Sequence, residues 1–272
     1  MSGTRHAVPL TVGRHVAPAL VVCVLTAGIG GPAPGQVQEP VAAVENAHLP
    51  FFAGERLTYR VRTSRFGGSG KGEMTVEGPV DLRGRATYLL RSKIETRVGP
   101  VKAVNRSESW LDYSRMTALR FRKRERSVVS SGSESVELFP ERRAWEAEDG
   151  RSGESVTDAP LDELSFIYFL RTVPLETDSL YRLDRHFDSA RNPTTVRVLG
   201  REEVVTPAGR FATIALEMRV KDPARYRGDG VIRINLTDDH CRLPVRIVSN
   251  VPVAGEATLT LEAHSHPMQH GN

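Results

Sequence analysis

The chain has 272 residues, of which 39% are hydrophobic and 26% are charged, a composition typical of folded proteins rather than disordered ones. Its formal charge is +4, from 37 Lys and Arg against 33 Asp and Glu. Such a near balance does not attract polyanions, so we predict no nucleic-acid partner. A chain of this length can bury enough surface to fold without a disulfide or a structural metal, and we predict no cofactor.

The N-terminal segment predicts export. Arg5 and Arg14 precede residues 16–28, an uncharged and mainly apolar stretch of about 13 residues, which is too short to span a bilayer comfortably. The small residues of Gly30–Gly35 follow it. This order is typical of a secretory signal peptide, so we predict one at residues 1–35 and a location in the periplasm or envelope of a bacterium. An uncleaved N-terminal anchor is the alternative.

The two cysteines do not suggest a disulfide. Cys23 lies inside the apolar stretch, between Val22 and Val24, which favours an apolar residue of the signal peptide over a lipidation site. The mature chain would then keep only Cys241, which cannot form an internal bridge. Because the remaining sequence has no apolar stretch of membrane-spanning length, we predict no transmembrane segment in the mature chain.

Alternating apolar and polar residues predict strands after a linker at residues 36–50. The alternation is clear in residues 57–61, 214–220, 232–236 and 257–263. A period of two marks strands with one buried and one wet face, which favours antiparallel pairing. About ten such segments with turns between them predict a single β-rich domain at residues 51–266, built as a sandwich or an open barrel, and a tail at residues 267–272.

One segment has helical spacing instead. Asp158 is placed to cap this helix, Pro160 suits its first turn, Asp162 and Glu163 complement its dipole, and Pro174 follows its end. The sequence therefore predicts one short helix that packs an apolar stripe on the sheet. The residues of that stripe are Leu161, Leu164, Ile167, Tyr168 and Leu170.

Two polar clusters are better explained as turns than as sites. Gly67–Gly72 lacks the spacing of a phosphate-binding loop and lies between two predicted strands, which favours a hairpin turn. Asp238–Cys241 contains four side chains able to bind metals. Consecutive residues of a strand point to opposite faces, so we predict a turn and no metal site there.

No catalytic motif is recognisable. His264 and His266 alternate as metal ligands can, but they lie near the C-terminal end, where an exposed tail is expected. His186 and Asp188 would point to opposite faces of a strand, and the sequence has no nucleophile elbow. We predict no catalytic residues, while an enzyme whose site is assembled from distant strands remains an alternative.

Aromatic residues are the only ligand-binding candidates. Tyr59, Trp110, Tyr168 and Phe169 could line an apolar cavity, as could Trp145. Ordinary burial in the core is the alternative for all of them.

Three stretches together resemble domain-of-unknown-function family 3108, a family of uncharacterised bacterial periplasmic proteins. They are Phe52–Val61 (FAGERLTYRV), Thr206–Met218 (TPAGRFATIALEM) and Leu236–Val248 (LTDDHCRLPVRIV). Asp162–Leu175 resembles the family's internal helix, and the match extends over residues 51–263. One departure is at Asn235 and Leu236, where the family often has a tryptophan.

The resemblance implies a curved antiparallel sheet, or half-open barrel, with one helix packed on it, as in the lipoprotein carriers of the periplasm. It supplies no catalytic residues. Our leading hypothesis is an exported envelope protein that binds a hydrophobic ligand, such as an acyl chain, in the curved sheet. The alternatives are a structural or assembly factor that binds another envelope protein, and an enzyme with a dispersed site.

Overall fold

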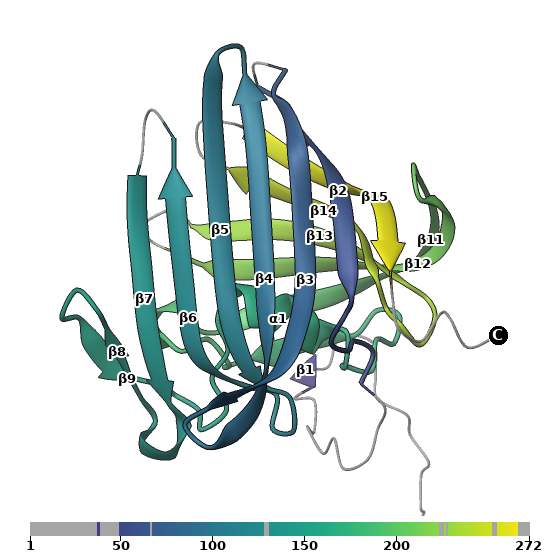
Figure 1. Ribbon diagram of the computed structural model, residues 1–272. Helices are drawn as coiled ribbons and strands as arrows, with labels where there is room; N and C mark the ends of the chain where they lie inside the picture. The colour runs from purple at the N-terminus through teal and green to yellow at the C-terminus, as the bar shows by residue number, and fades with distance from the viewer. Residues whose placement is uncertain are drawn as a thin grey trace, which may run out of the picture. The chain divides into compact units, whose positions relative to one another are not determined.

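The computed structural model of the chain describes residues 37–38, 49–65, 67–127, 131–222, 226, 228–251 and 255–265 (Figure 1). The predicted signal peptide and tail lie outside the described residues, as does most of the predicted linker. Within that linker, Val37–Gln38 forms a short strand, β1.

The described residues form one sheet of fifteen strands, one α-helix and two short 3-10 helices. The helices are α1 (Glu163–Leu170), η1 (Pro140–Arg142) and η2 (Ser189–Arg191). The strands after β1 are β2 (Arg56–Thr63), β3 (Ser69–Leu82), β4 (Arg85–Val98), β5 (Val101–Asp112), β6 (Thr117–Arg126), β7 (Ser131–Phe139), β8 (Ala144–Ala147), β9 (Ser152–Glu154), β10 (Leu180–Leu183), β11 (Thr194–Thr206), β12 (Gly209–Lys221), β13 (Asp229–Thr237), β14 (Pro244–Val251) and β15 (Gly255–Ser265).

The sheet is antiparallel throughout, except for the parallel pair of β1 and β10. Its strand order is β1, then β10 to β15, then β2 to β9, so β15 near the chain's C-terminal end pairs with β2. Among the described strands β9 and β1 end the order and do not pair with each other, so the sheet is not closed into a barrel. This confirms the predicted fold class, an open antiparallel sheet with one internal helix.

The single helix is shorter than predicted and is capped by a different residue. Asp162, not Asp158, is the N-cap, and its side chain accepts hydrogen bonds from the backbone N–H groups of Leu164 and Ser165. The Ser165 hydroxyl in turn accepts from the Asp162 N–H, which completes a capping box. Pro160 lies before the helix, where its carbonyl accepts from the N–H of Ala118 in β6. The predicted cap at Asp158 and first turn at Pro160 were therefore wrong.

The helix is buried nearly all round rather than along one stripe. Besides the predicted residues, Phe166 and Phe169 are buried, whereas Ile167 is only half-buried. α1 packs against β4 and β5 on what we call the inner face of the sheet, and the opposite face is the outer face. Large side chains of the inner face complete this core, among them Tyr59 and Leu216. A helix without a polar face fits this enclosed position.

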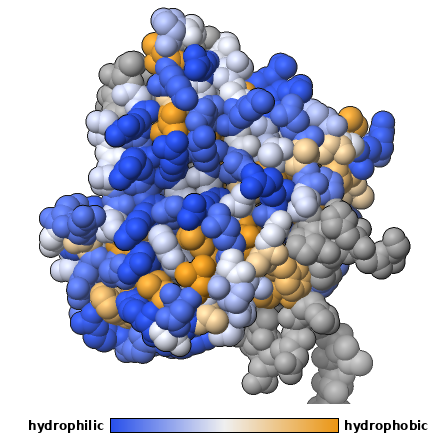
Figure 2. All heavy atoms as spheres, viewed as in Figure 1, coloured by the Kyte–Doolittle hydropathy of each residue, from blue (hydrophilic) through white to orange (hydrophobic). Residues whose placement is uncertain are grey.

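The outer face of β3–β7 is turned toward the viewer in Figure 1, with α1 behind it. Figure 2, seen from the same side, shows that hydrophilic residues cover most of this face. The alternation along β2 agrees with this, because Tyr59 and Val61 are buried whereas Arg60 and Arg62 are exposed. The outer face of the sheet is therefore polar and the inner face apolar along this strand, as the period of two predicted.

The glycine-rich stretch is only partly a turn. Gly67 lies in the turn, but β3 already begins at Ser69, so Gly70 and Gly72 lie within the strand. A β-carbon at Gly70 would lie 1.8 Å from the carbonyl oxygen of Glu95 on β4. Glycine is needed there because the neighbouring backbone approaches too closely for any side chain.

Candidate functional site

A polar pocket opens on the inner face of the sheet beside the start of α1. Its volume is about 380 Å³. Its lining comes from segments that are far apart in the sequence. These are strands β6 and β7, the β8–β9 turn, η2 and the residue after β12. The residues that line this inner-face pocket are Lys123, Glu125, Gly132, Ser133, Glu134, Arg151, Arg191 and Asp222.

The alternation of β6 places two of these charges inside. Phe121 is buried in the core, and Lys123 and Glu125 follow it at intervals of two, so all three point to the inner face. Lys123 is opposite Ser107 of β5, and Glu125 is opposite Asn105. The Lys123 side chain is only 9% exposed. Along the inner face of β6, the buried apolar residue Phe121 is therefore followed by two charged residues at the pocket.

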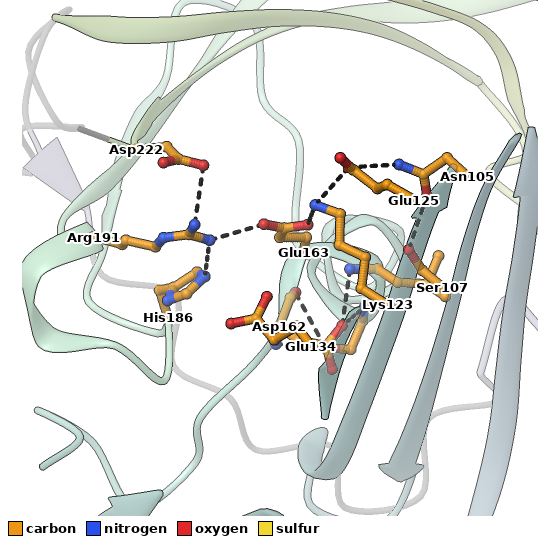
Figure 3. A network of polar contacts seen from close by, with 12 residues as sticks. Asn105, Ser107, Lys123, Glu125, Glu134, Asp162, Glu163, His186, Arg191 and Asp222 are labelled. Atoms are coloured by element: carbon orange, nitrogen blue, oxygen red, sulfur yellow. Dashed lines mark hydrogen bonds and ion pairs between the residues drawn. The ribbon is translucent and has the colours of Figure 1, made fainter. Parts of the chain in front are cut away.

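Glu163 links two cations at the centre of the site (Figure 3). The Lys123 Nζ lies 2.7 Å from Glu163 Oε2 and 3.5 Å from Glu125 Oε1. Arg191 donates from Nη1 to Glu163 Oε1 at 2.8 Å and from Nη2 to Asp222 Oδ2 at 3.0 Å. Burial by itself would raise the pKa of Glu163, but Lys123 and Arg191 outweigh it and lower that pKa to about 2.

The pKa values of the neighbouring Asp162 and His186 are shifted as well. Burial raises the pKa of Asp162 to about 6, although Ser109 donates a hydrogen bond to it at 2.5 Å. Burial and the nearby Arg191 lower the pKa of His186 to about 4, so its imidazole is neutral at pH 7. Ser109 is fully buried, and its hydroxyl cannot reach a substrate. These groups hold charges in place rather than form an accessible nucleophile and base.

Half-buried apolar side chains lie next to the charged pocket on two sides, on β4 and on β12. Ile94 of β4 is opposite Asn105, which is opposite Glu125, so Ile94 lies in the same row of the inner face as the pocket. On the other wall, Val220 lies two residues before Asp222. Ile94 and Val220 are both only partly buried against the main core. Charged and apolar surfaces thus meet on the inner face.

A second pocket, of about 490 Å³, lies beside a buried ion pair. Arg171 follows the last turn of α1 and binds both carboxylate oxygens of Glu55 at 2.7 Å. It also donates to the carbonyls of Pro50 at 2.7 Å and Cys241 at 2.9 Å. Burial alone would lower the pKa of Arg171, but Glu55 raises it overall. The pair joins three distant segments, and the residues lining the pocket are Leu49, Pro50, Arg171, Thr172, Val173, Pro174, Asp238, Asp239, His240 and Arg242.

The acids of this second pocket shape the β13–β14 turn, as predicted. Asp239 Oδ1 accepts from the Thr237 hydroxyl at 2.7 Å and from the Arg242 N–H at 3.0 Å. Asp238 is paired with Arg201 at 2.7 Å. Within the residues that the structure describes, no group of three or more acid, histidine or cysteine side chains is arranged to hold a metal ion.

The four predicted ligand-binding aromatics do not form one cluster. Tyr59, Tyr168 and Phe169 lie in the main core, and the Tyr59 hydroxyl donates to the Pro244 carbonyl at 2.9 Å. Trp110 is in a separate cluster and points to the outer face, beneath Arg120 and Arg122. None of the four lines either pocket described above. Contact of any of them with a ligand stays a prediction.

Sequence reasoning missed the charged residues of the inner-face pocket. In the basic run at residues 120–126, Arg122 and Arg124 lie on the exposed face of β6. The same alternation already places Lys123 and Glu125 on the face of Phe121, and this signal was available. Nothing in the sequence links these residues to Arg191, because that contact depends on the fold.

In the described part of the chain, no helix is long and apolar enough to cross a membrane. His186 and Asp188 do not form a base–orienter pair, because His186 Nδ1 accepts from the Asp188 backbone N–H at 3.0 Å. His264 lies in β15, and His266 lies outside the described residues.

The chain matches solved structures that are all distant in sequence. A β-barrel-like protein of the domain of unknown function DUF1849 from Brucella abortus is 10% identical, with a TM-score of 0.51, over 79% of this chain and 98% of that one. A protein of Bacteroides fragilis, provisionally described as exported with a YmcC-like fold, is 13% identical with a TM-score of 0.30, over 80% and 98%. A protein of Parabacteroides distasonis, provisionally described as a lipoprotein, is 10% identical with a TM-score of 0.30, over 81% and 100%.

No curated protein matches the chain. A protein-family model, however, matches residues 57–262, which extend from β2 to β15 and include α1, the whole lining of the inner-face pocket and part of the lining of the second pocket. The match confirms the resemblance of the three quoted stretches to this family. The chain therefore belongs to the family described as "Protein of unknown function (DUF3108)".

Proposed function

We propose that this chain is an exported, non-catalytic protein of a bacterial envelope that binds an amphipathic ligand on the inner face of its sheet. The observation that carries the proposal is the meeting of a charged pocket with half-buried apolar side chains, described above for Glu125 and Ile94. A purely apolar ligand would displace water from these charged groups and offer them no hydrogen bond in return, so the proposed ligand has a polar end and an apolar end.

The charges of the inner-face pocket favour a head group that carries both signs, or one rich in hydroxyl groups. Its lining has three cations, Lys123, Arg151 and Arg191, and three acids, Glu125, Glu134 and Asp222. A singly charged group would gain attraction from one set and repulsion from the other. The pocket volume of about 380 Å³ is at the small end of ligand sites, enough for a head group. The acyl part would then lie against the apolar row that includes Ile94.

Binding is favoured over catalysis by how the polar groups are held. Each carboxylate oxygen of Glu163 binds a different cation, and Asp162 is used as a helix cap. These groups fix the shape of the pocket, which a binding protein needs before its ligand arrives.

Native mass spectrometry of the protein purified from a bacterial periplasm, with solvent extraction, tests the proposal. We expect a reproducible adduct of lipid size that is lost on extraction. Ile94→Glu should abolish the adduct, because it puts a charge on the apolar row, whereas Val205→Glu should keep it, because Val205 is 64% exposed on β11. Circular dichroism checks that both variants are folded.

A clean mass without adduct at several expression levels would rule out the ligand and direct the search to protein partners. An adduct that survives in Ile94→Glu would place the ligand elsewhere. The intact mass of the same sample also tests export, because loss of residues 1–35 is expected.

A further inference from the structure

The outer face of the sheet carries an excess of positive charge that the whole-chain balance conceals. Ser109 of β5 and Lys123 of β6 contact Asp162 and Glu163 at the start of α1, so these positions face inward. The alternate positions, such as Arg122, face outward. Outward positions of β2–β6 can therefore be identified from the strand register.

One row of this face has three cations side by side. Lys93 of β4 is directly opposite Arg106 of β5, which is directly opposite Arg124 of β6. Like charges directly opposite each other in cross-strand pairs are destabilising, so this row of cations lowers the stability of the sheet. Arg106 and Arg124 are exposed and are available to an external partner.

We call a row the set of outward residues that are directly opposite one another on adjacent strands from β2 to β6. The excess of positive charge extends over four adjacent rows, which begin in β2 at Arg56, Thr58, Arg60 and Arg62. They hold twelve Lys and Arg against three Glu, a net charge of +9, while the chain has +4, so all other residues together have −5. Six of the cations have an ion-pair partner or lie over an aromatic ring: Arg56, Arg60, Arg91, Lys93, Lys102 and Arg122.

The other six have neither an ion-pair partner nor a ring contact in the part of the chain that the structure describes. They are Arg62, Lys71, Arg97, Arg106, Arg124 and Arg126. Figure 2 shows this side of β3–β6 as mostly hydrophilic. Unpaired cations gathered on one face attract an anionic surface, and salt weakens this attraction.

We propose that the outer face of β2–β6 docks on a bilayer that contains anionic phospholipids. Strands are about 4.8 Å apart and successive outward residues about 6.8 Å apart, so four rows on five strands form a patch of about 20 by 20 Å. The cations are distributed in both directions of this patch. A planar array of phosphate head groups can neutralise such a patch, whereas a single linear polyanion follows one stripe of it. The prediction of no nucleic-acid partner used the charge balance of the whole chain, and this face by itself is not balanced.

Vesicle binding tests the proposal. The protein accumulated by cells from the full-length gene is mixed with vesicles of phosphatidylcholine, with or without phosphatidylglycerol, and sedimented at several salt concentrations. We expect binding only to the anionic vesicles, with affinity falling as salt rises. The double variant Arg106→Glu and Arg124→Glu should bind at least about 30-fold more weakly.

A matched control separates the face from the net charge. Arg182→Glu with Arg210→Glu changes the charge equally, at exposed side chains of β10 and β12, and should bind like the wild type. The melting temperature of the Arg106 and Arg124 variant should not fall, because the pair of Lys93 with position 106 becomes one of opposite charges, while positions 106 and 124 stay a like-charge pair as in the wild type.

Three outcomes would overturn the proposal. Equal loss in both variants would mean that net charge alone acts. Equal binding to neutral and anionic vesicles would assign the affinity to the apolar N-terminal stretch, residues 16–28. Binding to a short DNA duplex but not to anionic vesicles would identify a linear polyanion as the partner. None of these outcomes depends on a ligand at the inner face.

Discussion

Replacing Glu55 with alanine is expected to lower the free energy of unfolding by about 3–5 kcal/mol, because it leaves a buried cation without its counter-charge. The side chains of Arg171 and Glu55 are 1% and 0% exposed. Both carboxylate oxygens accept from the guanidinium at 2.7 Å, so the variant loses two charge-assisted hydrogen bonds as well. Guanidinium denaturation followed by circular dichroism measures the loss.

The position of the pair explains why the loss should be global. Arg171 also donates to carbonyls of Pro50 and Cys241, and it lies over the rings of Phe51 and Tyr168 at 5.3 Å each. It therefore connects the segment before β2, the end of α1 and the β13–β14 turn. We expect a single cooperative transition at lower denaturant rather than a separate early phase.

A double variant distinguishes the buried charge from simple loss of packing. Glu55→Leu with Arg171→Met removes both charges and should be more stable than Glu55→Ala, since no unpaired charge remains. It should not reach the wild type, because the hydrogen bonds from Arg171 to the Pro50 and Cys241 carbonyls are lost. A loss below about 1 kcal/mol in Glu55→Ala would show that water reaches Arg171 and that the pair contributes little.

The sequence predicted the sheet well because period-two patterning is a local signal. The alternation at residues 214–220 and 232–236 became β12 and β13, with Leu216 opposite Ile234 as one buried face requires. The helix cap was harder to predict. Asp158 and Asp162 both precede the apolar run, and Asp162 is the cap because it forms a capping box with Ser165 and also accepts a hydrogen bond from Ser109, 53 positions earlier. A contact across such a separation leaves no trace in local propensity.

The candidate sites were not predictable for the same reason. The Glu55–Arg171 pair joins residues 116 positions apart, and the inner-face pocket joins β6 to η2 and the end of β12. Aromatic residues were chosen as ligand candidates by residue type alone, and three of the four are core residues. The outer-face charge shows a further limit, since a balanced total concealed a strongly basic face that only the register of β2–β6 reveals.

Glu163→Gln is expected to cost about 2 kcal/mol at pH 7 and almost nothing near pH 2. The pKa of Glu163 in the folded protein is about 2, below its ordinary value of 4.5, so its ionised form stabilises the fold. That stability is fully present above pH 4.5 and is lost as the pH falls through 2. The full shift corresponds to about 3 kcal/mol. The smaller expected cost allows for solvent screening, because the side chain is 31% exposed.

Asp162→Asn provides the matched test, because the adjacent carboxyl is shifted the opposite way. Its pKa is raised by burial to about 6, from 3.8, so its stabilising contribution is present below pH 3.8 and is lost as the pH rises through 6. Asparagine also caps helices and stays neutral. The stability of Asp162→Asn relative to the wild type should therefore increase from pH 4 to pH 7. The stability of Glu163→Gln relative to the wild type should stay low at pH 7.

Urea denaturation of the wild type and both variants between pH 3 and pH 7 measures the two effects. The differences from the wild type should change in opposite directions as the pH rises, since the two carboxyls are adjacent in the chain but lie in different surroundings. Glu163 is held between Lys123 and Arg191, whereas Asp162 is enclosed with only neutral donors. Parallel changes would mean that the two groups titrate as one, and that the charged network extends through the helix cap.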